Sequence, residues 1–266
     1  MSELLQRLKQ MLLGWGSVGV VYSLCDRLQG EGYRLTPLRV DALIPFSPDA
    51  VWLYLSFFLI VPLGYLLTPY NRVRWLARSM QFSALGAGII YLLWPTTMVY
   101  PTLAGEGVSS RVLGWLVSVD SRQNCFPSLH AALTALAVWA IAAGRLRWMA
   151  VASVIWACAI AYSILQLRRH LFIDLMAGVL LAGASVWLAG HLDVRRQNIK
   201  EYPVSELLFP VLFMLFFVCA EPVFFSSHGG RILTGSISFS ISIPGTLCCG
   251  FPVPGGALLR ICAGTL

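Results

Sequence analysis

A series of apolar segments separated by short polar loops constrains this chain more than any other feature. A membrane-spanning helix needs about 20 mostly apolar residues, and most of these segments approach that length. They cover residues 12–24, 50–67, 80–99, 128–143, 148–167 and 171–188, with a seventh over 204–225 that Pro210 and Pro222 interrupt. The sequence therefore predicts an all-α, polytopic transmembrane bundle with a six-helix core and a candidate seventh helix.

The composition places most of the chain in lipid. Hydrophobic residues make up 58% and charged residues only 12%, whereas a soluble domain carries about 25% charged residues. The net charge of +7 does not indicate nucleic-acid binding, because no basic stripe with interleaved aromatic residues is present. We expect a lipid bilayer around the chain and no nucleic-acid partner, and the oligomeric state stays open.

The loop charges predict an orientation. With the N-terminus inside, Lys and Arg residues are more numerous in the inside segments than in the outside loops, as the positive-inside rule requires. Residues 1–10 are polar and mixed in charge, and no signal-peptide cleavage site follows them. We therefore expect a multi-pass protein of an inner or plasma membrane, with the loops before residues 130 and 170 on the non-cytoplasmic face.

The C-terminal part differs in composition from the rest. Residues 226–266 are rich in Ser, Gly and Pro, and only Ser236 to Ile243 alternates as a strand does. We divide the chain into a transmembrane domain over residues 1–225 and an irregular tail over 226–266.

A first polar cluster stands at the start of the fourth apolar segment. Pro127 suits the first turn of a helix, Ser128 can cap the free backbone N–H groups, and His130 lies within that turn. A helix N-terminus is also an anion-binding site. The alternative is that Ser128 only caps the helix and His130 is an interfacial polar residue.

A second cluster precedes the sixth segment. His170 and Asp174 are four residues apart and share a helical face, so the carboxylate can orient the imidazole as a nucleophile. Arg168 and Arg169 add positive charge that suits a phosphoryl group. The alternative is an interfacial ion pair with two anchoring arginines. Two membrane crossings fit between His130 and His170, so the two clusters can converge on one face.

The two clusters together resemble a known family. Residues 126–130 (Phe-Pro-Ser-Leu-His) are similar to the Pro-Ser-x-His motif of the type 2 phosphatidic acid phosphatase superfamily. Ser163, His170 and Asp174 match three positions of its Ser-Arg-x5-His-x3-Asp motif. The sequence of residues 124–130 (Asn-Cys-Phe-Pro-Ser-Leu-His) is more similar to that of the branch that includes inositol phosphorylceramide synthases. The resemblance covers about residues 91–190.

The resemblance implies a six-helix core and a mechanism without metal or other cofactor. His170 would attack phosphorus to form a phosphohistidine, Asp174 would orient it, and His130 would protonate the leaving alcohol. The implied phosphate ligands are Ser128, Ser163, Arg168 and Arg169. Position 164 is Ile where the family has Arg, and the family's Lys-x6-Arg-Pro motif is absent. Arg168 or Arg169 is a candidate substitute for the charge missing at position 164. Arg122 is a candidate substitute for the missing motif, and the alternative is that Arg122 is a solvated loop charge.

These features predict an enzyme acting on membrane lipids. We expect a lipid phosphatase that removes phosphate from a lipid phosphate or diphosphate. Two alternatives remain open: a lipid headgroup phosphotransferase that uses the same phosphohistidine, and a non-catalytic membrane protein or transporter that keeps the fold.

Overall fold

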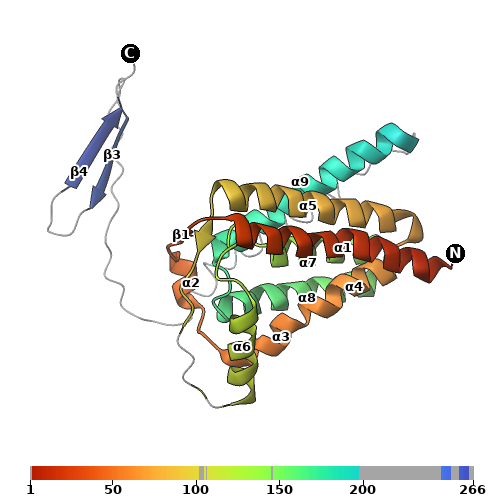
Figure 1. The fold of residues 1–266 in the computed structure, drawn as a ribbon, viewed down its shortest axis with the longest axis horizontal. Coiled ribbons are helices and arrows are strands. Elements are labelled where there is room, and N and C mark those ends of the chain that lie inside the picture. Colours follow the sequence, from red (N-terminus) through yellow and green to blue (C-terminus); the bar gives the residue numbers. More distant parts are fainter. Residues whose placement is uncertain are drawn as a thin grey trace. The chain divides into compact units, whose positions relative to one another are not determined.

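The structure is a computed structural model that describes residues 2–101, 105, 107–144, 146–197, 247–252 and 258–263. Two compact units are distinguished, Met1–Phe224 and Phe225–Leu266. In the described part of the first unit, long helices run side by side in a bundle (Figure 1). They are α1 (Glu3–Leu28), α4 (Phe57–Leu67), α5 (Val73–Leu93), α7 (Leu129–Ala142), α8 (Arg147–Gln166) and α9 (Phe172–Gln197). A short helix, α3 (Val51–Leu55), directly precedes α4.

Helix α7 forms the centre of the bundle. It packs against α4, α5, α8 and α9, and nearly all of its side chains are buried. A helix that is apolar on every side is expected in such a position. The site motif at the start of α7 is therefore fixed by neighbours on several sides.

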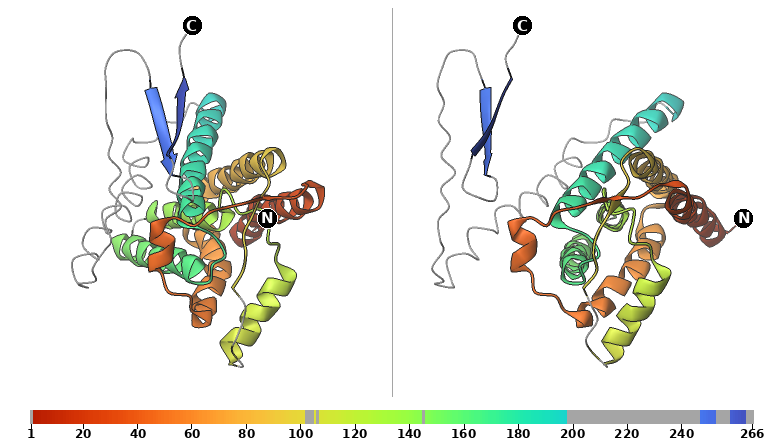
Figure 2. Two further views of the ribbon diagram at one scale, coloured as in Figure 1. Left: turned by 90° about the vertical axis from the view of Figure 1, so that its left-hand side faces the viewer. Right: turned by 60° about the vertical axis from the view of Figure 1, so that its left-hand side comes forward.

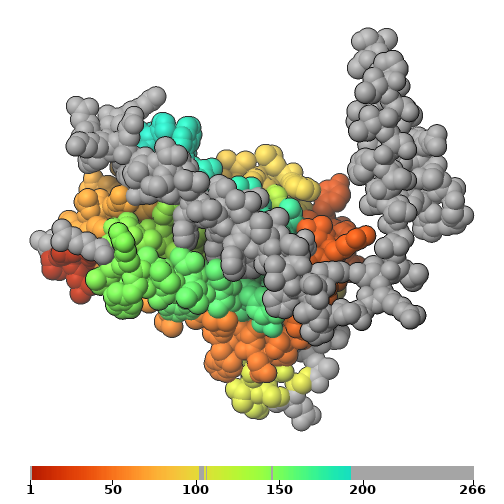
Figure 3. Space-filling model, turned by 180° about the vertical axis from the view of Figure 1, so that it is seen from behind, coloured from red at the N-terminus to blue at the C-terminus, as the bar shows by residue number. Residues whose placement is uncertain are grey.

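Among the described residues, four stretches of helix are long and apolar enough to cross a membrane: Pro48–Leu67, Tyr70–Leu93, Arg147–Gln166 and Phe172–Leu192. Helix α8, green in Figure 3, lies at the surface of the bundle. Its exposed side chains include Trp148, Val151 and Ile155. Apolar residues in water would be unfavourable on this scale, so this face suits contact with lipid. The predicted helical membrane bundle is confirmed.

Several helix limits differ from those predicted from the apolar segments. Helix α1 begins at Glu3 rather than near residue 12, because Arg7 donates hydrogen bonds to the carbonyl oxygens of Tyr65 and Thr68, at 2.7 and 2.8 Å. Helix α5 begins at Val73 rather than near residue 80. Its first turns contain buried residues, among them Trp75 and Leu76, between polar residues. Apolar content alone misses helical turns whose polar residues find partners in the tertiary structure.

The sequence predicts no helix between residues 99 and 128, whereas the structure has α6 (Val108–Val119) there. It runs across the direction of the bundle helices (Figure 1). It contacts α3, which forms the start of the apolar segment predicted over residues 50–67. The chain continues from α6 directly into the first site motif, so α6 belongs to the walls of the site.

Short elements gather at the end of the bundle where α7 and α9 begin. Strand β1 (Tyr33–Arg34) pairs in parallel with β2 (Thr96–Thr97), and α2 (Arg39–Leu43) lies nearby in the chain (Figure 2). β1 and α2 lie in the chain between α1 and α3, and β2 lies between α5 and α6.

In the second unit the described residues form a hairpin. Strand β3 (Leu247–Pro252) pairs antiparallel with β4 (Leu258–Ala263). This pairing was not predicted from the sequence. The predicted seventh helix over 204–225 and the alternating stretch over 236–243 lie outside the described residues.

Candidate active site

Three neighbouring elements hold the loop that leads into α7. The backbone N–H of Phe126 donates to the Thr96 hydroxyl at 3.0 Å, and the Tyr91 hydroxyl donates to the Pro127 carbonyl at 2.7 Å. The N–H of Ser128 donates to the Asp174 carbonyl at 3.0 Å. The Ser128 hydroxyl caps α7 by accepting from the N–H of Ala131 at 3.3 Å. The first motif is thereby tied to β2, α5 and α9.

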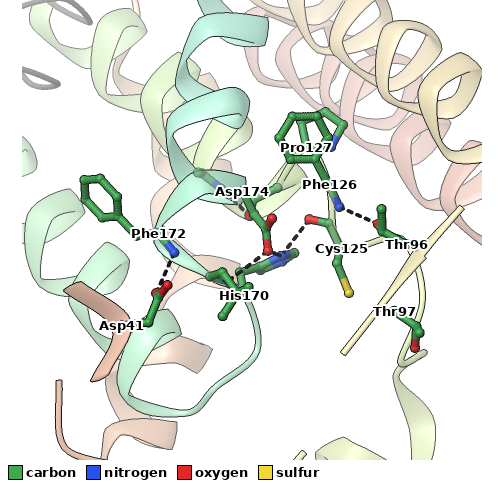
Figure 4. Close-up of polar contacts among 12 residues, drawn as sticks. Asp41, Thr96, Thr97, Cys125, Phe126, Pro127, His170, Phe172 and Asp174 are labelled. Carbon is green, nitrogen blue, oxygen red and sulfur yellow. Dashed lines mark hydrogen bonds and ion pairs between the residues drawn. The ribbon is translucent and has the colours of Figure 1, made fainter. Parts of the chain in front are cut away.

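The loop before α9 is anchored by Asp41, a buried residue of α2. One carboxylate oxygen of Asp41 accepts from the N–H of Phe172 at 2.8 Å, which caps the start of α9 (Figure 4). The guanidinium of Arg168 donates to the carbonyls of Asp41 and Ile44, the latter at 2.7 Å. A carboxylate near a helix N-terminus is favourable, so this anchor fixes the loop that presents His170.

The surroundings of His170 fix its tautomer. Its Nδ1 lies 2.9 Å from the Cys125 carbonyl oxygen, and a carbonyl only accepts, so Nδ1 carries the proton. The Nε2 lone pair is then available for nucleophilic attack. The nearer carboxylate oxygen of Asp174 is 3.6 Å from Nδ1, beyond hydrogen-bond range. The primary partner of His170 is thus a backbone carbonyl, with Asp174 as a second, longer-range partner (Figure 4).

Asp174 is completely buried at the start of α9. Its Oδ2 accepts from the N–H of Leu171 at 2.8 Å, while Oδ1 has no hydrogen-bond partner within the described residues. A buried carboxylate without full pairing is costly. Such a cost is typical of functional sites.

His130 approaches His170 from α7. The centroids of the two imidazole rings are 5.7 Å apart. The Nε2 of His130 is 2.9 Å from the hydroxyl of Tyr54, a fully buried residue of α3. Two imidazoles at this separation can act on opposite sides of one phosphoryl group.

Arg169 supplies a buried positive charge next to His170. Its residue exposure is 4%, one guanidinium nitrogen is ion-paired with Asp120, and the group lies 4.3 Å from the centre of the Tyr100 ring. The other terminal nitrogen, Nη1, is buried and has no partner in the described part of the chain. Burial is the largest single effect and lowers the pKa of Arg169, but the Asp120 carboxylate together with the hydroxyls of Tyr100 and Tyr54 raises the pKa by more, so it lies above its usual value. The side chain is therefore a cation with one unused donor.

The remaining predicted ligands lie outside this group. The Ser163 hydroxyl is buried within α8 and donates to the Ile160 carbonyl at 2.7 Å. Arg168 is occupied by the Asp41 anchor, and Arg122 is exposed, 5.8 Å from the centre of the Tyr100 ring. The geometry brings together His130, His170, Asp174 and Arg169, with Ser128 at the base of α7.

Sequence reasoning missed Tyr54 and Asp120. Tyr54 lies inside an apolar run, where no local pattern separates it from a membrane-interface aromatic. Asp120 lies between two predicted helices, where a charged residue gives no signal of a functional site. Both reach the site through α3 and α6, whose placement the sequence did not indicate. No group of three or more His, Cys, Asp or Glu side chains suited to a metal ion occurs among the described residues.

Comparisons with known proteins agree with the motif resemblance. A lipid A 4'-phosphatase of Bacteroides thetaiotaomicron (strain VPI-5482) is 41% identical over 83 residues, which cover 29% of this chain and 37% of that protein. The chain thus spans little more than a third of this relative's length. No solved structure gave a significant match. The family model of the PAP2 superfamily matches residues 49–188, more than half of the chain and the whole of both motifs. The chain therefore belongs to the PAP2 superfamily.

Proposed function

We propose that this protein is an integral membrane lipid phosphatase that works through a phosphohistidine at His170. The observation that carries the proposal is the hydrogen bond from Nδ1 of His170 to the Cys125 carbonyl, which leaves Nε2 free as a nucleophile. The superfamily membership and the phosphatase name of the Bacteroides relative support a phosphatase acting on lipids.

The reaction has two steps. Nε2 of His170 attacks phosphorus, and the bond from phosphorus to the lipid oxygen breaks as the imidazolium of His130 protonates that oxygen. Water then attacks the phosphohistidine, gives a proton to His130, and releases inorganic phosphate with His170 restored. Tyr54, 2.9 Å from Nε2 of His130, holds the ring in place between the steps.

Arg169 is the main phosphate ligand in this proposal. Its unpartnered Nη1 and its position next to His170 support this role, and Arg–phosphate contacts are among the stronger hydrogen bonds in proteins. The N-terminal N–H groups of α7, where Ser128 caps the helix, would hold another phosphate oxygen. Arg122 would act at the exposed rim, and Arg168 and Ser163 would act on the phosphate through the loop that they support.

Headgroup transfer is the second candidate. It is favoured by the sequence of residues 124–130, which is similar to that of the branch containing inositol phosphorylceramide synthases. The phosphohistidine is common to both reactions, and an acceptor alcohol replaces water in the second step. Phosphate release in the absence of any alcohol would favour hydrolysis.

The site would lie on the non-cytoplasmic face of an inner or plasma membrane, where the positive-inside rule puts its loops. Labelling of a cysteine introduced at Arg122 by an impermeant reagent in intact cells tests this orientation. Protection of that cysteine until the cells are lysed would reverse it.

The decisive experiment measures phosphate release and phosphoenzyme formation by the purified protein. The substrates are phosphatidic acid, phosphatidylglycerol phosphate, a polyprenyl diphosphate and lipid A. We expect an acid-labile, base-stable phosphoenzyme that is absent in His170→Ala. His191→Ala is the matched control, since the hydrogen bond of His191 within the described residues is to its own helix, 3.1 Å from the Trp187 carbonyl. Equal turnover by His170→Ala and the wild type would refute the mechanism.

A further inference from the structure

A cavity of about 440 Å³ extends from His130 between α1, α3, α4, α6 and α7. This volume lies in the range of about 300–1,000 Å³ that is typical of small-molecule sites. Polar side chains, including His130 and Asp120, occur at the end next to the site, and aromatic and aliphatic side chains form most of the remaining wall. The cavity is therefore continuous with the proposed phosphate site but is mostly apolar.

We propose that this cavity binds one alkyl chain of the lipid whose phosphate reacts at His170, and that Gly19 sets the chain length that it accepts. The inference rests on the proposed function and specifies its substrate: a phosphate ester of a long-chain alcohol or lipid. The alkyl chain would extend from the leaving oxygen, which His130 protonates, into the apolar part of the cavity.

The outer part of the cavity opens on an apolar surface. Phe58 of α4 and Trp115 of α6 line it and are also 48% and 60% exposed. Large aromatic side chains with one face in a cavity and another on the surface suit an opening toward the bilayer. Helix α6, which contributes Trp115 to this part of the wall, runs across the bundle (Figure 1). An alkyl chain could thus enter sideways without passing through water.

Gly19 lies on α1 and lines the exposed, outer part of the cavity. A Cβ atom added there would meet no heavy atom of the described residues within 4 Å. Gly19 therefore does not allow close packing of two helices, the usual reason for glycine in a membrane helix. A large side chain at this position would narrow the outer part of the cavity, where the far end of a long alkyl chain would lie, without displacing the described residues around it.

The test compares Gly19→Phe with Val20→Phe, a change of similar size at a neighbouring position that is 67% exposed and does not line the cavity. The substrates are a series of straight-chain alkyl phosphates from butyl to hexadecyl phosphate. The protein is kept in digitonin, which has no linear alkyl chain to compete.

For the wild type and Val20→Phe we expect kcat/KM to rise with chain length. In Gly19→Phe the value for hexadecyl phosphate should fall at least about tenfold, since losing the burial of two methylene groups changes an equilibrium by about this factor. Butyl phosphate should be hydrolysed as by the wild type, which shows that the variant is folded. Equal losses for all chain lengths, or the same loss in Val20→Phe, would overturn the proposal.

A binding measurement separates this proposal from the proposed reaction. Non-hydrolysable alkyl phosphonates are added, and the shift in thermal unfolding temperature is compared between butyl and hexadecyl phosphonate. A larger shift with the longer chain that Gly19→Phe removes supports the alkyl site even if no alkyl phosphate is hydrolysed, in which case only the phosphatase proposal fails. A shift that does not depend on chain length in the wild type refutes the alkyl site.

Discussion

Replacing Gly178 by alanine is expected to disable the site without removing any site residue. Gly178 lies on α9 where that helix meets the start of α7. A Cβ atom at this position would collide with the Ser128 carbonyl oxygen and would lie 3.1 Å from the Cβ of Ala131 and 3.2 Å from the Ser128 carbonyl carbon. Two of these three atoms belong to the backbone, so no side-chain rotation relieves the contact.

The expected magnitude follows from what must move. Overpacking a close-packed interior costs about 1–3 kcal/mol, and here it is relieved by shifting α9 from α7. The shift strains the bond from the Ser128 N–H to the Asp174 carbonyl, which is 3.0 Å long and joins the two motifs. A misplacement of about 1 Å between reacting groups costs about 100-fold in rate. We therefore expect kcat to fall by about 100-fold, with a modest loss of stability.

The assay is phosphate release at saturating lipid, with the unfolding temperature measured on the same samples. Gly86→Ala is the matched control on the α5 side of α9, because its Cβ would meet only the Cδ1 atom of Leu181, at 2.9 Å, and the flexible end of that side chain can turn aside. A Gly178→Ala variant with nearly wild-type kcat would refute the reasoning. An equal loss in Gly86→Ala would show that general packing, not the joint between the motifs, is responsible.

Three further predictions follow from the contacts of the site. Asp120→Asn removes the charge paired with Arg169, so inhibition by inorganic phosphate should tighten about tenfold, the scale of one charge-assisted hydrogen bond; unchanged or weaker inhibition would contradict the role of Arg169. Tyr54→Phe removes the partner of His130 and should lower kcat about tenfold with little change in KM, and a changed KM with a normal kcat would argue against it. Burial, followed by the charge of Asp174, raises the pKa of Cys125 to about 12, so its thiol stays protonated at pH 8. We expect it to react with maleimide only after denaturation in SDS, as measured by peptide mass spectrometry. Rapid labelling of Cys125 in the folded protein would contradict this.

The helices at the centre of the bundle could be predicted closely from the sequence. Helix α7 begins at Leu129 and α8 ends at Gln166, each within one residue of the apolar segment. Their composition is apolar throughout, so hydropathy alone marks their ends. The predicted start of α5 was several residues too late, because its first turns contain Arg74 and Arg78, and hydropathy assigns such residues to a loop. Trp75, between them, is buried in the core.

The convergence of the two motifs could also be predicted, because two crossings return the chain to the same face. The contacts that tune them could not. The sequence suggested Asp174 as the partner of His170, whereas the nearer acceptor is the carbonyl of Cys125. A carbonyl belongs to every residue and leaves no trace in the sequence, so its role appears only when the loop is folded.

The sequence by itself determined that this protein is a helical membrane bundle carrying two histidine motifs of the PAP2 type, since apolar length and motif spacing are local properties of the chain. Only the tertiary structure decided which arginine beside His170 has a donor nitrogen without a partner among the described residues, that Tyr54 and Asp120 reach the site, and that a cavity extends from His130 to an exposed surface. These depend on the packing of α1, α3 and α6 around α7, and contacts between segments distant in the chain are set by packing rather than by any local pattern.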